Sequence, residues 1–258
     1  MDFIDKRFER LALIADELFP RVVPSNGEHS EWLVTGPAFV ARATRSLFAM
    51  RFLRQARFDA DAFTLLRSLY EHLARFAWIA VDPPAHIEVW LKWDRKERIK
   101  ADNEAKQVDE RFFSADVRAH FEAERDAVEA DPMDLYSQAK AADAHWAQVI
   151  GVSSGRERYG FAGLYRTVYR WGSAVAHGTA FGLDTVITGS TPGTRTIGLE
   201  RDAEHNPYSL AQVVYAMGLL VYAQAFEVQG VAKALDDMAV AIPDPRVGEV
   251  PTGARVVR

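Results

Sequence analysis

The sequence predicts an all-α fold: a multi-helix bundle with one small β-hairpin inserted before the last long helix. Apolar residues recur at spacings of three and four through most of the chain, which is the pattern of amphipathic helices. Proline and glycine divide the chain into segments of helical length. One stretch, LDTVITGSTPGTRTIGLE, departs from this pattern, because two β-branched runs flank Pro192-Gly193, a pair suited to the centre of a type II turn.

The first half of the chain divides into four expected helices. Proline disfavours helical backbone in the residue before it, so the first helix should stop ahead of Pro20 and the third at the Asp82-Pro83 break. Asp59 or Asp61 is the expected N-cap of the third helix. The expected spans are Asp2–Phe19, Glu31–Gln55, Asp59–Val81 and Pro83–Lys106. The first helix should bury one face, made of Phe8, Leu11, Ala12, Ala15 and Leu18.

The second half continues with shorter helices and ends in a long apolar one. Asn206 and Pro207 form a cap and a first helical position for this last helix, which should run to Leu235. It is apolar on nearly all sides, so we expect it to be buried or at an interface. The expected spans before it are Ser114–Ala130, Asp134–Ile150 and Phe161–His177. We expect one domain over residues 1–240 and an irregular tail over 241–258.

Composition limits the classes of function. The chain has no cysteine, so it has no disulfide, thiolate nucleophile or cysteine-based zinc site, and its histidines form no tight metal-binding pattern. We therefore expect no metal and no cofactor. The formal net charge of −5 is opposite to that of a generic nucleic-acid binder. Between Trp32 and Phe58, however, the chain has no acidic residue and five arginines, which are dispersed around the expected helix as on a solvated surface.

No part of the sequence predicts a membrane segment or a secretory signal. Charged residues interrupt the apolar residues of the N-terminal stretch MDFIDKRFERLALIADELF, whereas a signal peptide needs an unbroken apolar run. Nowhere do about 18 apolar residues follow one another. We expect a soluble, cytoplasmic protein.

The helix Phe161–His177 carries the strongest chemical pattern. At about 100° per residue, one face collects side chains that can bind an anion and exchange a proton, and it has no carboxylate. This face consists of Arg166, Tyr169, Arg170, Ser173 and His177. The opposite, core-facing stripe consists of Leu164, Val168, Trp171 and Val175. The alternative is that the polar face is ordinary solvated surface.

Two sequence patterns resemble known families. The spacing from Arg170 to His177, R-x6-H near the end of a helix, resembles the motif of the HEPN superfamily. The wider pattern, R-S-x-x-E at Arg67 to Glu71 and Y-R-x-x-S-x-x-x-H-G from Tyr169 to Gly178, resembles an uncharacterised bacterial family that we take as a HEPN relative.

The resemblance implies a helical homodimer in which two such helices meet to form a metal-independent endoribonuclease, of the kind used in toxin or phage-defence systems. His177 would then transfer the proton and Arg170 would bind the phosphate. Arg166, Tyr169 and Ser173 would contact the substrate, and a toxin would also have an antitoxin partner, which the sequence does not identify. Active members commonly have a small polar residue after the arginine, where this chain has Trp171.

Two alternatives stay open. The first is a non-catalytic helical module whose Arg170 and His177 bind a nucleotide, RNA or a partner protein. The second concerns Arg67, Glu71 and Arg75, which are four residues apart on the third helix and can pair with one another. They form either a structural row of ion pairs or, for Arg67 and Glu71, a support that orients the Arg170/His177 helix.

Overall fold

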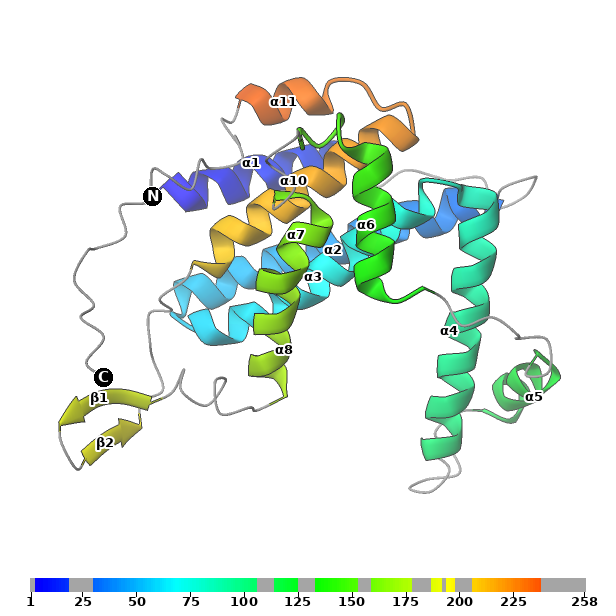
Figure 1. Ribbon diagram of the computed structural model, residues 1–258, viewed down its shortest axis with the longest axis horizontal. Coiled ribbons are helices and arrows are strands. Elements are labelled where there is room, and N and C mark those ends of the chain that lie inside the picture. The colour runs from blue at the N-terminus through cyan, green and yellow to red at the C-terminus, as the bar shows by residue number, and fades with distance from the viewer. Residues whose placement is uncertain are drawn as a thin grey trace.

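The computed structural model is an all-α multi-helix bundle (Figure 1), which confirms the predicted class. It describes residues 3–18, 30–105, 114–124, 133–152, 159–177, 187–191, 194–197 and 206–237. The expected C-terminal tail, 241–258, lies outside these residues. No helix in the described part of the chain is long and apolar enough to cross a membrane.

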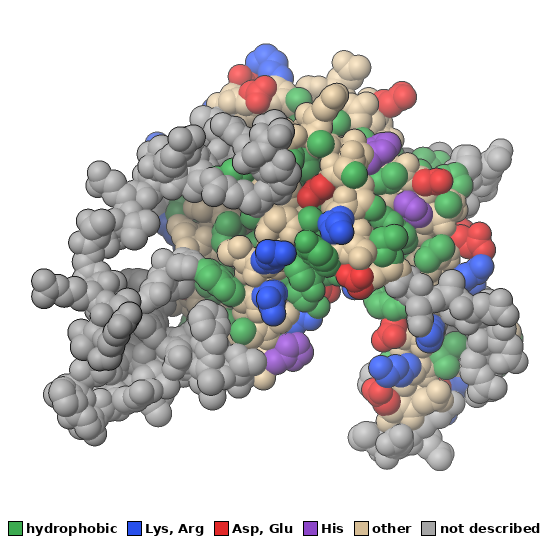
Figure 2. All heavy atoms as spheres, viewed as in Figure 1, with side chains coloured by type: hydrophobic (Ala, Val, Ile, Leu, Met, Phe, Trp, Pro, Cys, Tyr) green, Lys and Arg blue, Asp and Glu red, His purple; other side chains and the backbone are tan. Residues whose placement is uncertain are grey.

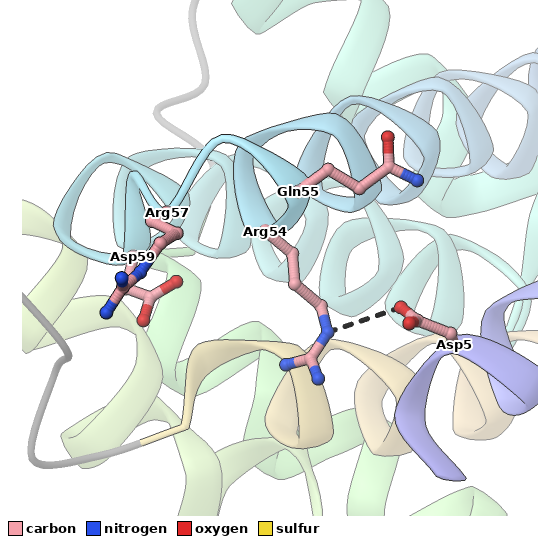
Figure 3. Close-up of a pocket in the computed structure, with 5 residues that line it drawn as sticks. All are labelled: Asp5, Arg54, Gln55, Arg57 and Asp59. Atoms are coloured by element: carbon pink, nitrogen blue, oxygen red, sulfur yellow. Dashed lines mark hydrogen bonds and ion pairs between the residues drawn. The ribbon is translucent and has the colours of Figure 1, made fainter. Parts of the chain in front are cut away.

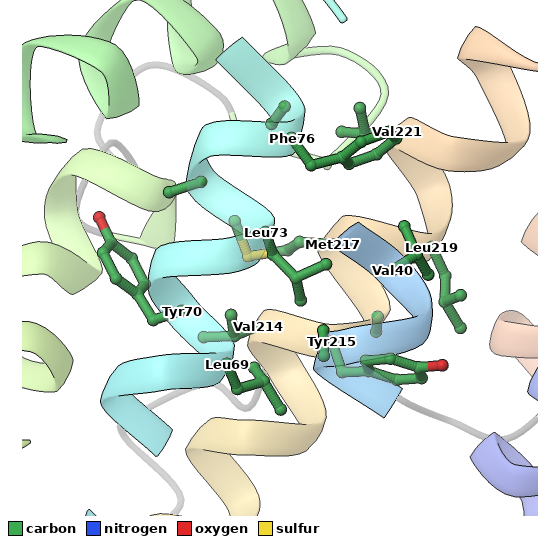
Figure 4. Packing of buried hydrophobic residues seen from close by; sticks show 14 of the residues in the cluster. Val40, Leu69, Tyr70, Leu73, Phe76, Val214, Tyr215, Met217, Leu219 and Val221 are labelled. Atoms are coloured by element: carbon green, nitrogen blue, oxygen red, sulfur yellow. The ribbon is translucent and has the colours of Figure 1, made fainter. Parts of the chain in front are cut away.

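Helix α3 (Asp59–Ile79) is the centre of the bundle. It packs against α2 (Ser30–Gln55), α10 (Pro207–Ala225) and α6 (Leu135–Trp146). Leucine and aromatic side chains of α3 interdigitate with those of α10 and α2 (Figure 4). At Gly218 the backbone of α10 comes so close that an added Cβ would lie 2.6 Å from a methyl carbon of Leu73. Helix α10 is buried on nearly all sides, as its composition predicts.

Helix α1 (Phe3–Leu18) lies on α2 and α10 and buries the predicted stripe, with Ala12 half-buried and Ile14 added to it. Its acidic side chains pair with arginines of α2: Arg51 Nη2 is 2.8 Å from a carboxylate oxygen of Glu9, and Arg54 Nε is 3.3 Å from one of Asp5. The basic stretch of α2 is thus partly neutralised by its neighbour.

Two local predictions were wrong. The N-cap of α3 is Phe58, without a side-chain cap, and Asp59 is already helical, because a turn after α2 leads directly into the new helix. The last helix does not continue to Leu235. It ends at Ala225, and α11 (Val231–Asp237) follows a turn in which Glu227 and Gly230 have positive φ. Glycine favours this backbone conformation, so Gly230 allows the chain to turn there.

Helices α4 (Pro83–Ala105) and α5 (Ala115–Glu124) form an arm beside the bundle (Figure 1). The first part of α4 packs on the bundle through Ile87 and through Trp90, which meets Phe39 edge-on at 5.0 Å. Asp102 is buried where α4 meets α5, 3.6 Å from Nε of Arg118.

Strands β1 (Ile187–Thr191) and β2 (Thr194–Ile197) pair antiparallel, with a register shift between Thr188 and Ser190. The expected turn residues Pro192 and Gly193 lie outside the described residues.

Candidate functional site

The predicted motif helix consists of three consecutive segments: α7 (Phe161–Leu164), the π-helical η3 (Tyr165–Tyr169) and α8 (Arg170–Ala176). Asp143 of α6 caps its start, accepting hydrogen bonds from the backbone N–H groups of Phe161 and Ala162 at 2.7 and 2.9 Å. Burial raises the pKa of this carboxyl, against the effect of the two hydrogen bonds. The helix therefore starts at a fixed point on α6.

The π segment changes which residues face the core. A π turn contains an extra residue, so the faces before and after it are rotated relative to a single α-helical wheel. Tyr169, expected on the outer polar face, is half-buried and stacks on Tyr165 at 4.7 Å. Trp171, expected on the core-facing stripe, does pack against the core: it is half-buried and meets Phe63 edge-on at 6.1 Å. Gly172 is the residue that is buried on α8.

The C-terminal end of α8 meets α3 through Arg67 and His177. These residues are 110 positions apart, and Nη1 of Arg67 lies 3.2 Å from Nε2 of His177. A guanidinium can only donate hydrogen bonds, so in this contact Arg67 is the donor and Nε2 of His177 is the acceptor. The imidazole thus lies next to a permanent positive charge.

Two further contacts fix the plane of the Arg67 guanidinium. Its Nε donates to Glu71 at 2.8 Å, and its Cζ lies 4.9 Å from the centre of the Tyr169 ring. Glu71 is also 4.0 Å from Nη2 of Arg75. Arg67 thus takes part in the row of ion pairs and also contacts the motif helix through His177 and Tyr169.

The other predicted site residues lie on the same helix as His177. Arg166, Arg170 and His177 are exposed, whereas Ser173 is half-buried. Basic side chains and a histidine lie along this helix in the space-filling view (Figure 2). Burial raises the pKa of Tyr165, and the nearby charge of Arg170 opposes that shift. Within the described residues, the hydrogen-bond partner of the His177 ring is Arg67, and no hydrogen bond joins it to Arg170.

Sequence reasoning missed two contributors to this site. Gly172 sets the approach of α8 to α3, and Tyr165 stacks beneath Tyr169. A glycine inside a helical pattern, in the run R-W-G-S, was the available indication of a close approach. The π turn that brings the two tyrosine rings together has no comparable sequence pattern.

A separate cavity of about 310 Å³ lies where α2 turns into α3 (Figure 3). It is lined by Asp5, Arg54, Gln55, Arg57 and Asp59. Its charges are largely paired inside the protein: Arg54 with Asp5, and Asp59 with the hydroxyl of Tyr208, which donates at 2.6 Å. Such a cavity offers an incoming ion little net attraction. Over the whole described part of the chain, no three His, Asp or Glu side chains come together as metal ligands would.

No curated protein and no solved structure matches the chain. One family model matches residues 35–194, a segment that begins within α2 and includes Arg67, Glu71 and the whole motif helix. The chain therefore belongs to the Family of unknown function (DUF5677).

Proposed function

We propose that this protein is a HEPN-type, metal-independent endoribonuclease whose site lies where α8 meets α3. The observation that carries the proposal is the contact between Arg67 and His177, which brings an imidazole nitrogen and a group able to bind phosphate together on an exposed part of the surface. The R-x6-H spacing supports the same assignment by resemblance.

The chemistry follows from these two groups. The Arg67 guanidinium would turn its Nη1 to an RNA phosphate, which frees Nε2 of His177 to take the proton of the adjacent 2′-hydroxyl. The 2′-oxygen attacks phosphorus, the bond to the 5′-oxygen breaks, and the imidazolium returns its proton to that leaving oxygen. The products are a 2′,3′-cyclic phosphate and a free 5′-hydroxyl. Arg67 and the exposed Arg170 would stabilise the negative charge of the transition state.

A homodimer would complete this site. Arg166, Arg170, Ala176 and His177 are all exposed on one helix, so a second copy could approach without displacing the core. Two converging copies would double the local positive charge, which explains how an acidic protein could attract RNA. Sedimentation of the wild type and of Arg166→Glu tests this arrangement. In the variant, the glutamates of the two copies would repel each other, or an ion pair made by Arg166 in the dimer would be lost, and either change would shift the population to monomers.

The test of function is cleavage of a fluorescent RNA in EDTA. His177→Ala should slow cleavage by roughly 10²–10⁴-fold, as expected when a general base is lost. Arg67→Ala and Arg170→Ala should each slow it by about 10²-fold through lost charge stabilisation. Arg10→Ala, an exposed arginine on α1, is the matched control and should leave the rate unchanged. Equal rates for His177→Ala and Arg10→Ala would disprove the proposed chemistry.

One observation favours a second candidate, a non-catalytic module that binds RNA, a nucleotide or a partner protein. The residue after Arg170 is Trp171, packed on Phe63, where active members of the resembled superfamily commonly have a small polar residue. In that case the wild type would bind RNA without cleaving it.

A role in a toxin or defence system, with an antitoxin partner, is part of the first candidate, the endoribonuclease. Growth arrest on expression, relieved by His177→Ala, tests that role.

A further inference from the structure

We infer that the site continues along α3 to a second phosphate position, formed by Arg75 beside Trp93 of α4, and that its substrate is an extended single strand of RNA. This inference rests on the proposed function for the identity of the ligand. Arg75 is placed against an aromatic ring in the same way as Arg67, and Arg75 is not part of the R-x6-H motif.

The two arginines are placed in the same way. Cζ of Arg67 lies 4.9 Å from the ring centre of Tyr169, and Cζ of Arg75 lies 4.7 Å from that of Trp93. Both face Glu71, which lies between them on α3. Eight residues of helix separate the arginines by roughly 12 Å along the axis. Each guanidinium is thus backed by an aromatic ring, at opposite ends of one row.

The row has an excess of positive charge. Glu71 is its one carboxylate, and it bonds Arg67 at 2.8 Å but stands 4.0 Å from Arg75, beyond hydrogen-bond reach. Burial lowers the pKa of the neighbouring His72, and the charges of Arg42 and Arg75 lower it further. At the Arg75 end, therefore, the guanidinium has the weaker carboxylate partner.

The row is accessible. The side chains of Arg67 and Arg75 are 22% and 25% exposed. Because Arg67 contacts α8 and Arg75 contacts α4, the row runs between those two helices. The surface is hollowed between the end of α8 and the α4–α5 arm (Figure 2).

The half-buried position of the row favours a single strand over a duplex. The bases of a duplex are stacked on one another, whereas the unpaired bases of single-stranded RNA stack on aromatic rings and on arginine planes. The outer faces of the two guanidinium groups are such planes, and their edges can bind phosphates.

The experiment measures binding directly, with a labelled eight-nucleotide RNA that carries 2′-fluoro groups and so cannot be cleaved. Arg75→Gln should weaken binding roughly tenfold, as for a lost hydrogen bond to a charged group. It should also lower the slope of log affinity against log salt by about 0.7, the value for one phosphate contact on a single strand. Arg10→Gln makes the same change of charge on α1 and should match the wild type. Trp93→Leu is a second variant that should weaken binding while keeping Arg75, and thermal melts of all variants check that each is folded.

The outcomes separate the two proposals. If the wild type cleaves no unmodified RNA in EDTA, but binds the 2′-fluoro RNA more tightly than Arg75→Gln does, the proposed catalysis is wrong and the second phosphate position stands. If the wild type cleaves RNA but folded Arg75→Gln and Trp93→Leu bind like Arg10→Gln, the second position is wrong and the catalysis stands. A wild type that binds a duplex of equal length as tightly overturns the choice of a single strand. A wild type that binds no RNA overturns both.

Discussion

Gly172 lies directly against Arg67: a Cβ added at position 172 would be 2.5 Å from the Cβ of Arg67 and 2.6 Å from the carbonyl oxygen of Phe63. Contacts this short do not occur between real Cβ atoms and backbone. The close approach of α8 to α3 therefore depends on glycine at this position. It is also what brings His177, one turn later, within reach of Arg67.

Gly172→Ala should destabilise the protein. Alanine favours a helix over glycine by about 1 kcal/mol. The new methyl, however, would meet the Phe63 carbonyl, which belongs to the central helix and cannot turn aside. Overpacking of this kind costs typically about 1–3 kcal/mol, so we expect a net loss in the free energy of unfolding, measured in urea.

Ser173→Ala is the neighbouring control, since it changes the same helix without adding volume, and it should stay within about 0.5 kcal/mol of the wild type. A Gly172→Ala protein as stable as this control would mean that α8 can move away from α3 at little cost.

Arg67→Lys should disrupt the site although it keeps the charge. Arginine reaches Glu71 through Nε and His177 through Nη1 at the same time, while its plane lies on Tyr169. A lysine ammonium has no planar fork and cannot make the three contacts together. We expect RNA cleavage to fall nearly as far as in Arg67→Ala. Recovery of most of the wild-type rate would show that charge alone is sufficient.

The sequence predicts the helices well because their ends are marked by local chemistry. Asn206 and Pro207 start α10 as expected, with the Asn206 side chain accepting from the N–H groups of Tyr208 and Ser209. Asp134 caps α6 in the same way, accepting from Tyr136 and Ser137. The break after Ala225 was missed although Glu227, Gln229 and Gly230 interrupt the apolar run there. In the structure Glu227 and Gly230 have the positive φ angles that form the turn.

The site was only partly predictable. Arg170 and His177 are seven residues apart on one helix, so this helix and its exposed polar residues could be predicted from the local sequence. The partner of His177 is not local: Arg67 comes from a helix 110 residues earlier, and its position depends on Gly172 and on the π turn at Tyr165–Tyr169. A helical wheel assumes one repeat throughout, so it placed Tyr169 on the outer face, although Tyr169 packs against the core; Trp171 packs against the core as the wheel predicted.

His72 should make stability fall at mildly acidic pH. It is largely buried beside α2, its Nδ1 donates to the carbonyl of Ser68, and burial together with Arg42 and Arg75 lowers its pKa. The unfolded chain takes up a proton near pH 6.5, before the folded chain does. The free energy of unfolding is therefore unaffected by this group above that pH, and it declines as the pH falls from there toward the lower pKa of His72 in the folded protein. In urea titrations between about pH 7.5 and 5, His72→Gln should lose less stability than the wild type; an equal loss would assign the decline to other groups.

Asp143 should show the opposite dependence on pH. Burial raises the pKa of its carboxyl above the value of about 3.9 in an unfolded chain. Over the interval between the two values the folded protein holds the proton that the unfolded chain has released, so the contribution of this group to stability falls as pH rises through it. Asp143→Asn removes the titration, and Asn can still accept one of the two N–H bonds from Phe161 and Ala162. The free energy of unfolding of the wild type, minus that of Asp143→Asn, should therefore decrease from acid pH toward neutrality in urea titrations at matched ionic strength. An increase would show that the two N–H bonds at the start of α7 stabilise the carboxylate more than burial destabilises it.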